Sequence, residues 1–222
     1  MTSNEDTSIK IAWTEPAFNG GSPIFGFKIN IKQKDGTFSE DLTHCDGADQ
    51  STKANLFCLI PMETLRTGSF LLEKGSTLIA TVQSFNIIGY SDVSPENTSG
   101  ADIRTEPDAP SNLPQRIDAL TTDTSITIEV ANFDTAPENG GSPIISLSVW
   151  WDQGVSIWVP ISGDSPDFSL ETQHTVYMLA PAGSYRFKYR AINIFGEGPF
   201  SSEQEIIAAT APDQSEPATT VV

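Results

Sequence analysis

Few side chains of this 222-residue sequence could do acid–base, nucleophilic or metal chemistry. It has two cysteines, Cys45 and Cys58, and two histidines, His44 and His174. The cysteines are too widely spaced for a CxxC redox or zinc motif, and the histidines lie far apart. His44 adjoins Cys45, but neighbouring residues of a strand point to opposite faces, so an activated thiol is not expected. GxSxG, P-loop and GxGxxG motifs are absent as well, and we predict no catalytic residue and no enzyme.

The two cysteines bracket a polar stretch, CDGADQSTKANLFC. They are either free thiols of a protein in a reducing compartment or the two halves of a disulfide. A disulfide would close a loop of about 14 residues and contribute about 3 kcal/mol in the chain-entropy model. The residues alone leave both alternatives open.

Acidic residues dominate the charge, with a formal net charge of −17. Such a chain repels nucleic acid and anionic lipid, so neither is an expected partner, whereas divalent cations are permitted. Calcium takes six to eight oxygen ligands, and carboxylates crowd the middle of the sequence. The candidate ligands are Asp102, Glu106, Asp108, Asp134 and Glu138. The alternative is a solvated acidic surface with no cofactor.

A strongly alternating stretch, SYRFKYRAIN at residues 184–193, predicts a strand with an aromatic face and a basic face. Its inward residues are Tyr185, Phe187 and Tyr189, and its outward residues are Arg186, Lys188 and Arg190. In the stretch IISLSVWWD, Trp150 is out of phase with the inward residues and falls on the same outer face. This face is either a cation–π and salt-bridge ladder on a solvated sheet or a protein-binding patch.

The elements that carry these residues belong to a duplicated unit. NGGSPI occurs at residues 19–24 and again at 139–144, and NIIG at 86–89 is matched by NIFG at 193–196. Each NGGSPI lies between two runs of alternating apolar residues, and its Gly and Pro suit a tight turn between strands. About seven short strands per unit, without a helical period, predict an all-β chain of two immunoglobulin-like β-sandwiches.

The repeat divides the chain into residues 1–105, residues 106–211 and a tail at 212–222. A Pro-rich stretch, TEPDAPSNLP, connects the two units. Only MTSNED precedes the first alternating run of the first unit, so that unit is expected to lack its first strand. No apolar run is long enough to span a bilayer, and direct membrane insertion is not expected.

These residues resemble fibronectin type III domains over nearly the whole chain. The resemblance in the first unit rests on Trp13, NGGSPI, Phe27, Ile29, Asn86, Gly89 and Ser91, and in the second on Leu179, Pro181, Tyr185, Phe187, Tyr189, Ala191, Asn193 and Gly196. Tyr185 matches the tyrosine corner of the family. Each unit differs from the family pattern at one aromatic position. In the first unit Leu78 occupies the position of that tyrosine, and in the second unit Val130 occupies the position of Trp13.

A narrower resemblance covers the first unit only. SEDLTHCDGADQ, CLIPMETL, FLLEKGS and NIIGYSDVS are similar to repeats of very large extracellular or surface proteins of unicellular eukaryotes. This resemblance implies an extracellular or cell-surface location and favours a Cys45–Cys58 disulfide. It also makes Asn97, in the sequon NTS, a candidate N-glycosylation site. The start of the sequence has no secretion signal, so the signal was removed or excluded, or the protein is intracellular.

The sequence thus predicts a non-catalytic structural or adhesive module, a spacer or protein-interaction segment of a repeat array. The alternatives are an intracellular scaffold of the same fold and an accessory module of a secreted enzyme. The tail resembles the stretch that enters the second unit, so copies could assemble head to tail into a filament. In that hypothesis residues 215–222 pair beside Ile9 and Ile11 of the next copy. Otherwise the chain is simply a segment of a longer array.

Overall fold

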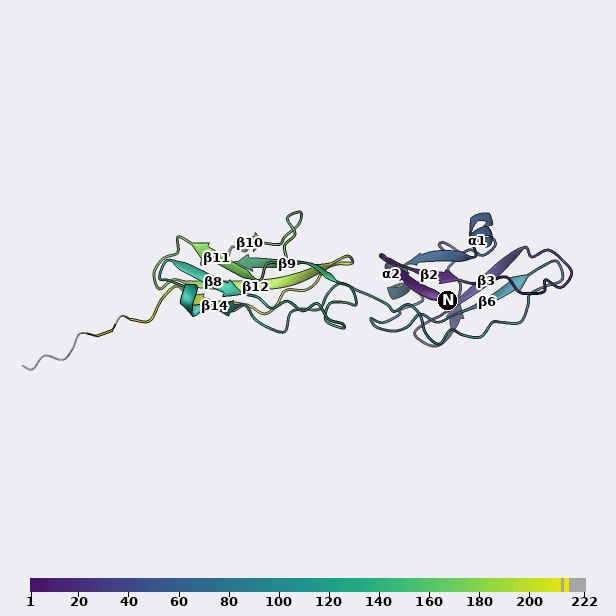
Figure 1. The fold of residues 1–222 in the computed structure, drawn as a ribbon, viewed down its shortest axis with the longest axis horizontal. Helices are drawn as coiled ribbons and strands as arrows, with labels where there is room; N and C mark the ends of the chain where they lie inside the picture. Colours follow the sequence, from purple (N-terminus) through teal and green to yellow (C-terminus); the bar gives the residue numbers. More distant parts are fainter. Residues whose placement is uncertain (213, 216–222) are drawn as a thin grey trace, which may run out of the picture. The chain divides into compact units, whose positions relative to one another are not determined.

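The computed structural model describes residues 1–212 and 214–215 and contains two compact units. The first comprises Met1–Glu106 together with the loop segments Thr135–Pro143 and Ile194–Gly196. The second comprises Pro107–Asp134, Ile144–Asn193 and the chain from Glu197. The strands of each unit can be followed in Figure 1.

Two three-stranded antiparallel sheets form the first sandwich. One has the order β1-β2-β5, built from Thr2–Glu5, Ser8–Ala12 and Phe57–Pro61. The other has the order β4-β3-β6, built from Phe38–Ser39, Gly26–Lys32 and Ala80–Phe85. The apolar alternation of β2 and β3 buries Ile9, Ile11, Ile29 and Ile31, as the period of two predicts.

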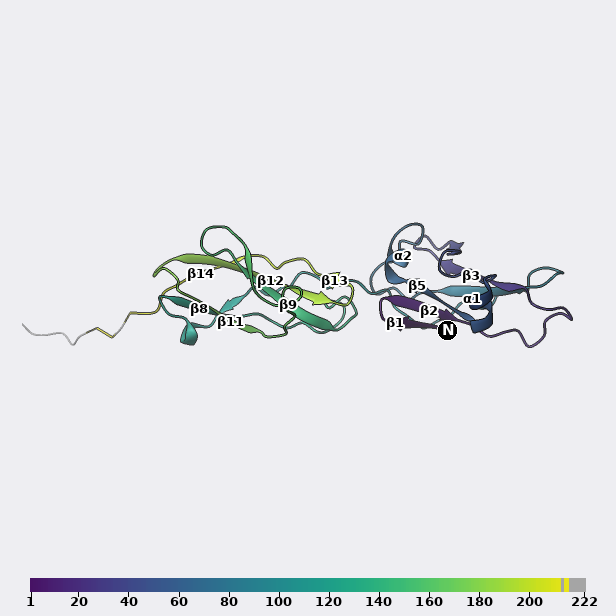
Figure 2. The same cartoon turned by 90° about the horizontal axis from the view of Figure 1, so that it is seen from above.

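The first strand of this unit is present, and the prediction that it is missing is wrong. β1 pairs with β2 in an antiparallel register that places Thr2 opposite Ile11 and Asn4 opposite Ile9. The connecting turn is short and includes Asp6 at φ 49°. Figure 2 shows β1 beside β2. The edge beside Ile9 and Ile11 is therefore filled by the chain itself, which removes the site assigned above to residues 215–222. Residues 216–222 of that tail lie outside the described part of the chain.

Two short helices, which the sequence did not predict, interrupt the first unit. α1 (Gln50–Asn55) begins after Asp49, whose carboxylate accepts hydrogen bonds from the backbone N–H groups of Ser51 and Thr52. α2 (Met62–Arg66) buries Met62 and Leu65. Helices of one or two turns are too short to show a 3.6-residue period, which explains why the pattern did not predict them.

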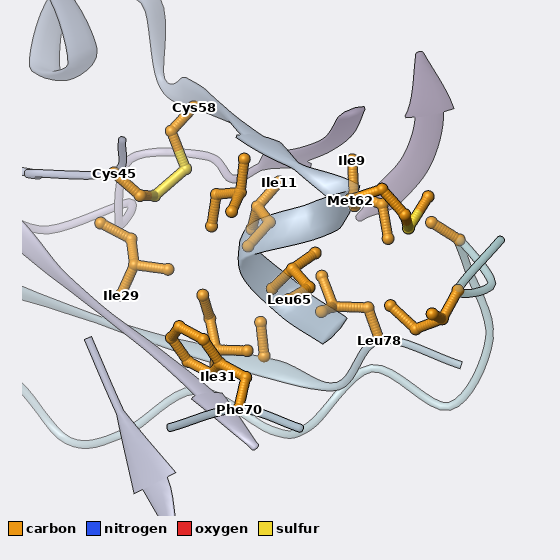
Figure 3. Packing of buried hydrophobic residues seen from close by; sticks show 14 of the residues in the cluster. Ile9, Ile11, Ile29, Ile31, Cys45, Cys58, Met62, Leu65, Phe70 and Leu78 are labelled. Atoms are coloured by element: carbon orange, nitrogen blue, oxygen red, sulfur yellow. A yellow bond between two sulfur atoms is a disulfide. The ribbon is translucent and has the colours of Figure 1, made fainter. Parts of the chain in front are cut away.

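The core of the first unit lies between its two sheets and is closed by α2. Ile9, Ile11, Ile29, Leu65 and Leu78 are almost completely buried. Cys45 and Cys58 form a disulfide inside this cluster, and Figure 3 shows the bond beside Ile11 and Ile29. The disulfide thus joins the loop after β4 to β5 within the core.

The second sandwich has a three-stranded sheet and a larger sheet, both antiparallel. The small sheet has the order β11-β8-β7, built from Gln173–Tyr177, Ser125–Glu129 and Gln115–Arg116. The larger sheet contains β10 (Val159–Ser162), β9 (Ile144–Trp151), β12 (Ser184–Asn193), β13 (Gly196–Glu197) and β14 (Gln204–Ile207), with β9 and β12 adjacent. A 3₁₀ turn, η1, spans Asp118–Leu120.

Tyr185 anchors this sandwich in the way that the resemblance implies. Its hydroxyl accepts a hydrogen bond of 2.9 Å from the backbone N–H of Ala180, which ties the turn before β12 to that strand. Tyr185, Phe187 and Tyr189 are buried, so the predicted phase of the strand is confirmed. Their burial leaves Arg186, Lys188 and Arg190 on the opposite face.

Candidate interaction surface

The outer face of the larger sheet carries a set of stacked aromatic and basic side chains, here called the aromatic–basic ladder. Its members are Trp150, Trp158, Phe200, Arg186, Lys188 and Arg190. Strand pairing brings them together, because Lys188 of β12 lies directly opposite Trp150 of β9. Residues that face each other across antiparallel strands share one face of the sheet.

The basic groups of the ladder lie over two aromatic rings. Lys188 Nζ is 3.9 Å from the centre of the Trp158 ring and 4.5 Å from that of Phe200. The Arg190 guanidinium lies 4.6 Å from the centre of the Phe200 ring, and the Arg186 guanidinium lies 5.6 Å from that of Trp158. Cation–π contacts at these distances hold the side chains flat against the sheet.

Trp150 packs against an aromatic ring and not against a basic side chain of the ladder. It lies on the outer face as expected, but its ring packs edge-on against Phe200, with centroids 5.7 Å apart. Its Nε1–H donates a hydrogen bond of 2.8 Å to Ser148 Oγ. The cation–π contacts of the ladder found in the described residues go to Trp158 and Phe200 on this face. Trp150 therefore supports the ladder through Phe200 rather than by stacking on a base.

Carboxylates neutralise both arginines of the ladder. Arg190 pairs with Asp164 at 3.2 Å and with Glu197 at 2.6 Å. Arg186 pairs with Asp152 at 2.9 Å and with Glu203 at 2.8 Å. Four acids against three bases leave no excess positive charge, so the geometry does not favour an acidic partner. Lys188 has ring contacts but no ion pair within the described part of the chain.

Asp152 is the buried acid of this set. Burial alone would raise the pKa of its carboxyl group. The hydrogen bonds from the backbone N–H groups of Arg186 and Gly154, and the charge and Nε–H of Arg186, outweigh burial and hold that pKa below its usual value. Asp152 therefore remains ionised and fixes the start of the ladder to the turn after β9.

The calcium candidates do not form a cluster. Asp102 accepts a hydrogen bond from Thr77, and Glu106 forms a two-point ion pair with Arg66 that lowers its pKa. Among the described residues, no group of three or more acidic, histidine or cysteine side chains could hold a metal ion. The structure thus does not bring Asp102, Glu106, Asp108, Asp134 and Glu138 together, and calcium binding stays an untested prediction.

Asn97, the candidate glycosylation site, bridges two segments of the first unit. Its Nδ2 donates to the carbonyl oxygens of Leu78 and Ser99, at 2.7 and 3.2 Å, and its Oδ1 accepts 2.7 Å from the Ala80 N–H. A glycan on Nδ2 would replace one of the two hydrogens that make these bonds. The folded geometry therefore argues against a glycan at this residue.

Sequence reasoning missed Trp158, Phe200, Asp152 and the other acids of the ladder. Trp158 and Phe200 lie in loops before β10 and after β13, where no alternation indicates a face. The aromatic residues in or beside β-patterned runs were the available signal. Only the register between strands shows which of them reach β12.

Solved structures similar to this chain include domains of titin and of chicken CNTN1. No family model matches the chain. Domains A168–A170 of titin are 19% identical, cover 91% of this chain and 58% of that chain, and give a TM-score of 0.45. The FN1–FN3 domains of chicken CNTN1 are 13% identical, with coverages of 94% and 65% and a TM-score of 0.34. The chain therefore spans less than two thirds of each of these structures.

Each of the two units is an antiparallel β-sandwich, the architecture that fibronectin type III domains also have. In each unit a three-stranded sheet packs against a sheet that contains a pair of long antiparallel strands, β3 and β6 in the first unit and β9 and β12 in the second. The predicted fold class is confirmed. The narrower resemblance to proteins of unicellular eukaryotes stays a prediction. None of the helices in the described chain is long and apolar enough to cross a membrane.

Proposed function

We propose that this chain is a non-catalytic structural module of an extracellular or cell-surface repeat protein, which acts as a spacer and contacts other proteins. The observation that carries this proposal is the Cys45–Cys58 disulfide, which lies buried in the core of the first unit. Disulfides persist in oxidising compartments and are rare where glutathione keeps thiols reduced. No cysteine of the chain is left free.

The aromatic–basic ladder supports a role in contacts between proteins. Tryptophan, tyrosine and arginine dominate the binding energy of interfaces, and here one sheet face carries two tryptophans and two arginines. Because both arginines are already paired with acids, a partner would gain mainly from the rings and from Lys188. We infer an apolar protein surface as the partner.

The redox state of the cysteines tests the compartment. The protein is purified from its native source with an alkylating agent present and no reductant, and its intact mass is measured. The expected mass carries no alkyl group, and a reduced, denatured sample carries two. Two alkyl groups without reduction would overturn the extracellular proposal and favour an intracellular scaffold. A Cys45→Ala, Cys58→Ala variant controls for modification of other side chains.

A further inference from the structure

The two copies of NGGSPI form the same turn. In the first copy the Gly21 N–H donates to Asn19 Oδ1 at 3.0 Å, and in the second the Gly141 N–H donates to Asn139 Oδ1 at 2.9 Å. The middle glycines, Gly20 and Gly140, both have φ 74°. Each turn lies beside the matching NIIG or NIFG loop of its sandwich; in the first unit Asn86 Nδ2 donates to the Asn19 carbonyl oxygen at 2.9 Å. The NGGSPI turn and the NIxG loop are called the platform below.

The second platform is occupied by a chain segment of the same compact unit. Residues 135–143 and 194–196 belong to the first compact unit, as does the segment that ends at Glu106. The Thr105 N–H donates to the Gly140 carbonyl oxygen at 2.9 Å. A Cβ on Gly140 would lie 2.1 Å from the Thr105 carbonyl oxygen, so glycine is required for this approach. Phe195 packs against the core cluster of the first unit.

The first platform has the same shape but lies open. Ile88, which matches Phe195, is 85% exposed, and Phe18 beside the turn is 78% exposed. Both line a hollow of about 350 Å³ together with Phe85 and Tyr90. The nearest atom to a Cβ built on Gly20 is Asn86 Nδ2, at 3.2 Å. Among the described residues, no backbone atom of another segment lies within 4 Å of this position, in contrast to Gly140.

A segment that matches the occupant occurs once more in this chain. Thr105, Glu106 and Pro107 are repeated as Thr210, Ala211 and Pro212, each triplet following the last strand-like segment of its unit. Thr105 and Pro107 are buried, whereas Thr210 and Pro212 are exposed.

The end of the second unit that carries Thr210 also exposes apolar side chains. Tyr177 and Met178, at the turn between β11 and β12, are 69% and 99% exposed. The same turn is fixed to the chain before Thr210, since the Ala182 N–H donates to the Ala208 carbonyl oxygen at 2.9 Å. These side chains would cover Ile88 in the way that the first core covers Phe195.

We propose that the open platform of one copy, formed by residues 19–24 and 86–89, binds the Thr210–Pro212 segment of a second copy. This inference deepens the proposed function as a structural module. The contact joins two different surfaces, so it is heterologous and builds linear assemblies rather than closed dimers. Between separate molecules the contact is weak, because it lacks the effective concentration of millimolar order that a short linker supplies.

The test is a concentration series of the whole chain followed by amide NMR. We expect the resonances of Gly20, Gly21 and Ile88 to shift together with those of Thr210 and Ala211 as the concentration rises to about 1 mM. The variant Ile88→Ser should weaken the association at least about tenfold, because it removes the apolar side chain that the contact would bury. Val155→Ser, a substitution at another exposed apolar residue, should leave it unchanged.

A pair of glycine variants tests the geometry. Gly20→Ala places a methyl group where the occupant's carbonyl would lie, so it should abolish the concentration-dependent shifts. Gly36→Ala carries the same kind of backbone strain, since Gly36 has φ 87°, but it lies outside the platform and has nothing within 4 Å of a Cβ, so it should retain them. Unchanged resonances over the whole series, or equal effects of the two variants, would overturn the proposal. The redox test of the compartment is independent of either result.

Discussion

Asp152 holds Arg186 at two points, accepting hydrogen bonds of 2.9 Å from its backbone N–H and from its Nε–H. The side chain of Asp152 is buried, whereas the second acid on Arg186, Glu203, lies in the solvent. Removing the Asp152 carboxylate should therefore lower the free energy of unfolding more than removing that of Glu203. This difference gives a test of what positions the ladder.

We predict that Asp152→Ala lowers the free energy of unfolding by about 2 kcal/mol, because it leaves charge-assisted hydrogen bonds of the β9 turn and Arg186 unmade. Glu203→Ala, the matched control, should cost less than about 1 kcal/mol, since exposed pairs contribute little. Urea denaturation of both variants is the measurement. Equal costs would show that Asp152 does not organise the ladder.

The disulfide gives a second prediction. The double variant Cys45→Ala, Cys58→Ala should lose roughly 2 to 5 kcal/mol, because the loop after β4 regains its freedom in the unfolded chain and the core loses a buried contact. The second unit has no cysteine and serves as an internal control in the same protein. Site-resolved hydrogen exchange should therefore show lower protection in the first unit only, and reduced protection in both would contradict it.

The third prediction concerns Asn97. Asn97→Ala should destabilise the first unit by about 1 to 3 kcal/mol, since the buried backbone groups of Leu78 and Ala80 lose their partners. Ser99→Ala removes the same sequon but keeps these bonds, because Ser99 accepts only through its backbone carbonyl oxygen, so it should be nearly neutral. Mass spectrometry of protein secreted from eukaryotic cells should find Asn97 unmodified. A glycan at Asn97 in a fully folded protein would refute this interpretation.

The sequence was sufficient to predict what depends on local alternation. The period of two in residues 184–193 placed Tyr185 in the core and Lys188 outside, and the structure agrees, because burial of one sheet face fixes the phase of a strand. It also identified the duplicated NGGSPI turn, whose glycines take the same positive φ in both copies.

Features that depend on contacts distant in sequence were not predictable in this way. β1 is polar and short, and it is defined by pairing with β2 rather than by an apolar pattern. Trp158 and Phe200 reach Lys188 only through the register of three strands and their loops. The sequence did not show the structural role of Asn97. An asparagine in a sequon has the same local sequence whether its side chain carries a glycan or hydrogen-bonds the backbone of another segment.

The last prediction is a pH dependence that comes from His174 on β11. Burial lowers the pKa of His174 below its usual value, although the hydrogen bond of Nε2–H to the Glu171 carbonyl oxygen acts in the opposite direction. The folded protein therefore keeps this imidazole neutral at a pH where the unfolded chain, with a pKa near 6.5, already binds a proton. Stability should be unaffected by His174 above that pH and should fall as the pH decreases from about 6.5 towards 5.5, with a slope of at most about 1.4 kcal/mol per pH unit. His174→Gln keeps a donor near Glu171 but cannot titrate, so its unfolding free energy should change less over the same interval. Urea denaturation at pH 7.5, 6.5 and 5.5 compares the two proteins, with values chosen above the usual range of carboxylates. If both proteins lose stability equally, the buried histidine is not the group that titrates.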